Sequence, residues 1–78
     1  MDKQTLINVL RKLPVLPFED YGNLVSIADI YSACSTYGLD VREIIELKLL
    51  ELEKEGTLKV IYMKNPGFEE LLVGIKFR

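Results

Sequence analysis

Two helix-like segments joined by a three-residue turn are the feature that most constrains the fold of this chain. Apolar residues recur at intervals of three and four over residues 27–37 and again over residues 41–55, which is the period of one helix face. Gly38 can end the first helix in a left-handed conformation, and Asp40 with Glu43 can cap the start of the second. A connection this short predicts two helices that cross steeply. The core-facing side of the second helix is predicted to carry Val41, Ile44, Ile45, Leu49 and Leu52.

Another amphipathic helix is predicted upstream, over residues 2–13, where leucines recur at helical spacing until Pro14 ends the helix. Residues 14–25 form an extended connector, because its prolines fix the backbone and remove amide donors. Within this connector we expect a turn at residues 22–23 and a very short strand at residues 24–25.

Residues 57–77 are predicted to form a β-hairpin. Two segments rich in β-branched and aromatic residues flank the sequence NPG, which suits a four-residue turn. If Lys64 faces Gly67 across that turn, Val60 lies opposite Leu71. The predicted core-facing set is then Leu58, Val60, Leu71, Val73, Ile75 and Phe77.

The composition favours one small globular domain over residues 1–78 and argues against enzymatic chemistry. Of the 78 residues, 49% are hydrophobic and 28% charged. There is no histidine, and the single cysteine, Cys34, lies on the apolar stripe of a predicted helix, where we expect a core residue. Ser-His and Cys-His catalysis then lack a base, and a zinc site lacks ligands, so we predict neither an enzyme nor a bound metal or cofactor. No apolar run is long enough to span a membrane, so we predict a cytoplasmic protein without a membrane partner.

The order helix, short strand, helix, tight turn, helix and hairpin resembles the winged helix-turn-helix superfamily over residues 24–78. The passage SIADIYSACSTYGLDVREIIELKLLELEKEGTLKVIY carries the likeness, and LLELEKEGTL is similar to the end of the recognition helix in small regulators of that superfamily. The resemblance implies an α+β fold with three helices packed on a C-terminal β-hairpin wing. It also implies a third helix that enters the DNA major groove and a wing that touches the flanking backbone.

A transcriptional regulator that binds double-stranded DNA is therefore the leading functional hypothesis. The net charge of −2 and the acidic third helix weaken it, because affinity for DNA comes from neutralised phosphates. The wing is the better electrostatic candidate, and Lys3, Arg11, Lys12 and Lys76 with Arg78 could add charge if the hairpin and first helix meet. The candidate DNA contacts are Arg42, Glu46, Lys59, Lys64 and Asn65, with Glu43 beside them on the helix.

The alternative hypothesis is a winged-helix module for protein–protein interaction or dimerisation that binds no nucleic acid. Either hypothesis is compatible with a homodimer, which we predict. The candidate partner or dimer surface consists of Leu47, Leu50, Ile61, Met63, Phe68 and Leu72. These side chains could instead be covered by Val15, Leu16 and Phe18 of the connector. A third interpretation is the stacking of single-stranded bases on tyrosines, of which only Tyr62 lies in a strand flanked by lysines.

Overall fold

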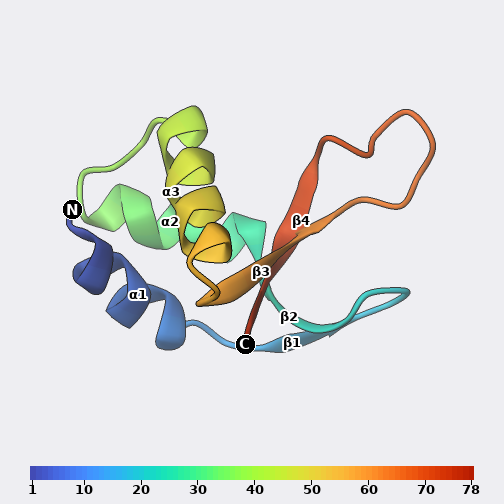
Figure 1. Ribbon diagram of the computed structural model, residues 1–78, viewed down its shortest axis with the longest axis horizontal. Helices are drawn as coiled ribbons and strands as arrows, with labels where there is room; N and C mark the ends of the chain where they lie inside the picture. Colours follow the sequence, from blue (N-terminus) through green and yellow to red (C-terminus); the bar gives the residue numbers. More distant parts are fainter.

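Three helices pack against an antiparallel β-sheet in the computed structural model, which describes residues 1–78 (Figure 1). The helices are α1 (Lys3–Arg11), α2 (Ile27–Thr36) and α3 (Arg42–Lys54). The strands are β1 (Leu16–Phe18), β2 (Gly22–Ser26), β3 (Leu58–Tyr62) and β4 (Leu72–Phe77), and their order in the sheet is β1-β2-β4-β3. The fold is therefore α+β. No helix is both long and apolar enough to cross a bilayer.

The helices lie within the ranges predicted from their apolar spacing, and four of their ends are held by a side chain or a glycine, at Asp2, Ser26, Gly38 and Gly56. The Asp2 carboxylate accepts a hydrogen bond of 2.8 Å from the Thr5 amide at the start of α1. Gly38 follows the end of α2 with a φ of +83°, the left-handed conformation that glycine adopts without strain. The predicted cap of α3 is wrong: Val41 occupies the N-cap, and Asp40 instead accepts a hydrogen bond from the Ser35 hydroxyl.

The connector between α1 and α2 contains a β-hairpin that was not predicted. Leu16 pairs with Leu24 and Phe18 with Gly22, so Gly22 lies in a strand, not in the predicted turn. The turn lies between Phe18 and Gly22, with Asp20 in a left-handed conformation at φ 70°. Pro17 is tolerated because β1 is the edge strand of the sheet, where one side needs no amide donor. The short strand expected at residues 24–25 is present within β2.

The hairpin of β3 and β4 is present, but its predicted register is wrong. Val60 pairs with Ile75, four residues beyond the predicted partner Leu71. The turn at the NPG sequence does form, because the Phe68 amide donates to the Asn65 carbonyl at 3.0 Å. A second turn follows it at once, in which the Leu71 amide donates to the Phe68 carbonyl at 3.0 Å, and the strands therefore meet further from the tip. Side chains alternate between the two faces of a strand, so a register shift of four residues leaves Val60 and Ile75 facing the core. Leu71, the predicted partner of Val60, is 51% exposed.

The core lies between the helices and the sheet. One cluster of buried residues joins all three helices to β2, β3 and β4, and Cys34 belongs to it, as predicted. The side of α3 that faces this cluster is narrower than predicted, because Val41 and Ile44 are exposed. The cluster consists of Leu6, Leu10, Val25, Ile30, Cys34, Ile45, Leu49, Leu52, Leu58, Val60 and Ile75.

Candidate interaction surfaces

The outward side of α3 carries an alternating set of leucines and charges that we name the α3 seam: Glu43, Leu47, Leu50 and Lys54. At 3.6 residues per turn these four side chains fall within an arc of about 60°, opposite the buried side of the helix. Leu47 is 61% exposed and Leu50 is 38% exposed. Glu43 and Lys54 have no ionic partner, since the chain has a single ion pair, between Lys3 and Glu55.

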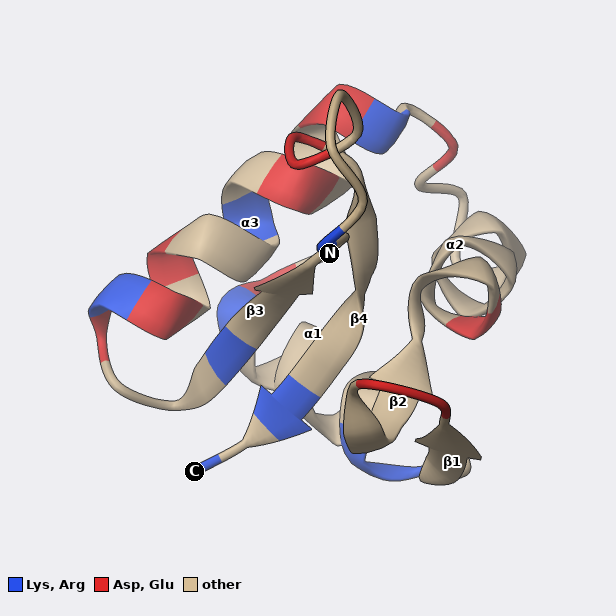
Figure 2. Ribbon diagram, turned by 90° about the vertical axis from the view of Figure 1, so that its right-hand side faces the viewer, with Lys and Arg blue, Asp and Glu red and all other residues tan.

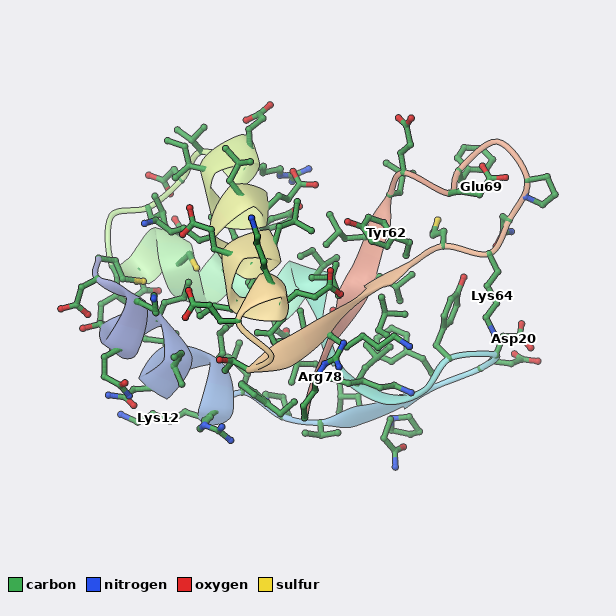
Figure 3. The ribbon with its side chains drawn as sticks, in the orientation of Figure 1. Lys12, Asp20, Tyr62, Lys64, Glu69 and Arg78 are labelled. Atoms are coloured by element: carbon green, nitrogen blue, oxygen red, sulfur yellow. The ribbon has the colours of Figure 1, made fainter.

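The side of α3 that faces the hairpin is dominated by carboxylates. Glu53 accepts a hydrogen bond of 2.7 Å from the Val60 amide, which ties α3 to β3. Tyr62 lies between α3 and the β3–β4 loop (Figure 3), and its pKa is raised by partial burial and then by the negative charges of Glu53 and Glu46. The pKa of Tyr31 is raised by burial and by Glu46. A phosphate between α3 and the hairpin would therefore meet a negative field.

Two of the candidate DNA contacts are engaged in contacts within the chain. The guanidinium of Arg42 lies 4.8 Å from the centre of the Tyr31 ring. The Lys64 amide donates to the Tyr21 hydroxyl at 2.9 Å, and the Lys64 ammonium donates to the Asp20 carbonyl. Figure 3 shows Lys64 reaching from the β3–β4 loop to the tip of the β1–β2 hairpin. The two hairpin tips are thus joined, and Lys64 is held away from a phosphate.

The remaining DNA candidates do not lie together. Asn65 is exposed in the β3–β4 loop, with its carbonyl used in the turn, and Glu46 is half-buried on α3. Lys59 is exposed on β3, directly opposite Lys76 on β4. The structure therefore separates Lys59 from Lys64, although both belong to the same hairpin.

Cations converge at the end of the sheet away from the loop, on a surface that we name the basic sheet end. The Arg78 amide donates to the Thr57 carbonyl at 3.2 Å, which keeps Arg78 beside the start of β3. The Arg11 guanidinium lies 4.3 Å from the centre of the Phe77 ring, so the first helix and the hairpin meet here. Figure 2 shows the basic positions of β3 and β4 side by side near the C-terminus, whereas acidic and basic positions alternate along α3. The basic sheet end consists of Arg11, Lys59, Lys76 and Arg78.

The six apolar residues predicted as a partner surface lie on α3 and on the hairpin. Leu47, Leu50, Met63 and Phe68 are exposed, whereas Ile61 and Leu72 are half-buried. Leu72 packs against the core cluster. Of the connector residues that could have covered this surface, Val15 and Leu16 are themselves exposed and Phe18 is half-buried.

A slot of about 290 Å³ opens between β2 and β4. Its floor is formed by the buried residues Leu24, Val25 and Ile75, and Lys76 and Phe77 lie on its rim. The slot exists because β2 pairs with β4 only at Val25 and Ser26 and then turns away to pair with β1. No group of three or more His, Cys, Asp or Glu side chains is placed to hold a metal ion.

No family model, curated protein or solved structure matches the chain. Sequence reasoning predicted Leu47 and Leu50 as partner residues, but it missed their grouping with Glu43 and Lys54 in the α3 seam, and it missed the slot entirely. The α3 seam had a signal in the spacing Glu43, Leu47, Leu50 and Lys54, which is a helical stripe opposite the core-facing one. The slot had no signal in the sequence, because it depends on the hairpin of β1 and β2, which was not predicted.

Proposed function

We propose that the chain is a winged-helix domain that forms a homodimer through its third helix. The element order supports the winged-helix assignment, as does the position of β4 between β2 and β3 in the sheet. The dimer rests on one observation: the side of α3 that points away from the core carries two exposed leucines flanked by unpaired opposite charges. A surface of this kind suits an apolar partner better than a DNA groove.

The α3 seam is complementary to itself in an antiparallel arrangement. When Leu47 packs beside Leu50 of a second copy, Glu43 falls beside Lys54 of that copy, because each charge lies four residues outside its leucine. A two-fold axis repeats both contacts, giving four leucines at the centre and a Glu–Lys pair at each end. A parallel arrangement would place like charges together. Charge and shape therefore favour one orientation and one register.

Binding of duplex DNA by α3 remains the prediction of the family resemblance, and the surface chemistry gives it less support. Electrostatic affinity for phosphates comes from cations, and α3 carries Glu43, Glu46, Glu51 and Glu53 against three basic residues. In the wing, Lys64 is engaged with the β1–β2 hairpin. The two functions would compete at this helix, since a dimer through the α3 seam would cover Glu43, which lies beside the predicted DNA contacts Arg42 and Glu46.

Sedimentation velocity over about 1–100 µM protein tests the dimer. We expect a concentration-dependent dimer that Leu47→Glu dissociates, because it places a carboxylate among the leucines. Leu71→Glu is the matched control, since Leu71 is also an exposed leucine but lies in the β3–β4 loop. A monomer at every concentration, or equal weakening by both variants, would overturn the proposal.

A charge-exchange series tests the register. Glu43→Lys alone should weaken the dimer about tenfold, because two ion pairs become two repulsive contacts. Lys54→Glu alone should do the same, and the double variant should restore most of the affinity. Failure of the double variant to recover would rule out this antiparallel register. Fluorescence anisotropy with duplex DNA at low salt, measured on the wild type and on Leu47→Glu, tests the competing hypothesis, which predicts duplex binding that Leu47→Glu reduces.

A further inference from the structure

None of the four cations of the basic sheet end has a carboxylate partner. The one ion pair of the chain lies elsewhere, between Lys3 and Glu55. Lys59 and Lys76 are direct cross-strand partners, an arrangement that destabilises a sheet when the charges are alike. The Lys76 ammonium lies beside Gly22 of β2, and an anion bound near it would offset this repulsion. The charge pattern therefore points to an anionic ligand.

The slot between β2 and β4 adjoins these cations and adds an apolar component. Lys76 belongs to both features, since it lies on the rim of the slot and is paired with Lys59 across the strands. Phe77 also lies on the rim, and Arg11 lies over its ring. The lining of the slot is mostly apolar, with Val15 as its exposed apolar side chain, and its volume is about 290 Å³. A ligand that fits both features combines a flat, largely apolar group with several phosphates.

We propose that this surface binds single-stranded nucleic acid, with one base in the slot and the neighbouring phosphates on the basic sheet end. A single strand is favoured over a duplex because only an unstacked base can enter the slot. The site includes no residue of α3. It goes beyond the dimer and does not depend on it, so the failure of one proposal leaves the other untouched.

Fluorescence anisotropy with a labelled oligothymidine of about twelve nucleotides tests the proposal. If four phosphates are neutralised, raising the salt from about 50 to 200 mM should weaken binding about 50-fold. An abasic strand of the same length keeps the phosphates and removes the bases. It should bind at least about fivefold more weakly, because it cannot fill the slot.

Variants with the same change in net charge locate the phosphates. Lys59→Gln with Lys76→Gln should reduce the salt effect to about sevenfold over the same range, because two contacts are lost. Arg42→Gln with Lys48→Gln removes two cations from α3 and should leave binding unchanged. Asn23→Trp, which places an indole at the rim of the slot, should lower the affinity for oligothymidine to that for the abasic strand. Circular dichroism melts establish that each variant is folded.

Several outcomes would overturn the proposal. If the abasic strand binds equally well, no base occupies the slot. If a duplex of the same length binds more tightly, the site is not specific for single strands. A loss of affinity confined to the α3 variant would place the phosphates on the third helix. Absence of binding at low salt would exclude the site altogether.

Discussion

Gly74→Ala tests the contact that joins the N-terminal half of the sheet to the hairpin. A Cβ atom at this position would lie 2.0 Å from the Val25 carbonyl oxygen and 2.6 Å from a methyl of Leu24. Ordinary contact requires a further 1 Å or more, so β2 must retreat from β4 by about that distance. Only two residue pairs, Val25 with Ile75 and Ser26 with Gly74, hold these strands together. Losing the hydrogen bonds of these two pairs costs about 1 kcal/mol each. Strain in the surrounding core costs about 1–3 kcal/mol more.

The expected loss is therefore about 3–5 kcal/mol, which lowers the midpoint of thermal unfolding by about 12–40 °C in a domain of this size. Circular dichroism melts measure this shift. Gly67→Ala is the matched control: Gly67 has a φ of +86°, but nothing lies within 4 Å of its added methyl. It should lose only the conformational term, about 1–2 kcal/mol. If Gly74→Ala melts no lower than Gly67→Ala, the close approach of β2 to β4 is not part of the fold.

Three further changes test individual groups. Glu53→Ala should lower the free energy of unfolding by about 1–2 kcal/mol, because it leaves the Val60 amide without its acceptor. Glu53→Gln keeps an acceptor oxygen and should lower it less, which thermal melts of the two variants can measure. The pKa of Asp2 is lowered by its hydrogen bonds from Thr5, so this cap stabilises the fold above the ordinary pKa of 3.8 and is lost as the pH falls through the lower folded value. The difference in melting temperature between wild type and Asp2→Ala should be constant near neutral pH and shrink in strong acid. Burial raises the pKa of Cys34, so its thiol should react with a disulfide reagent only when the domain opens; rapid reaction under native conditions would contradict its place in the core.

The helices could be predicted because their signals are local. The apolar period over residues 27–37 and Gly38 at its end need no information from the rest of the chain. The register of the hairpin could not be predicted in the same way. The turn at Asn65 forms as expected, but a second turn through Phe68 separates it from the strands, and only packing of Ile75 against the helices fixes the pairing.

The two candidate sites differ in the same way: one depends on local sequence signals and the other on tertiary packing. The α3 seam lies on one helix, and its spacing is visible in the sequence, although the predicted partner surface combines Leu47 and Leu50 with residues of the hairpin. The basic sheet end combines Arg11 with Lys76, which are far apart in the chain and share one region only because Phe77, the neighbour of Lys76, lies beneath the Arg11 guanidinium. Such a surface depends on tertiary packing. Sequence reasoning could state only the condition for it, that the hairpin and the first helix meet.

The two proposed associations differ in their physical origin, and salt should therefore separate them. Contacts at the basic sheet end are almost entirely electrostatic, so nucleic-acid binding should fall steeply as salt rises. The α3 seam has leucines at its centre and one exposed ion pair at each end, so the dimer should weaken only slightly over the same range. Sedimentation and anisotropy measured across one salt series compare both directly. If the dimer disappears together with nucleic-acid binding, its stability comes from Glu43 and Lys54, and the central role given to Leu47 and Leu50 is wrong.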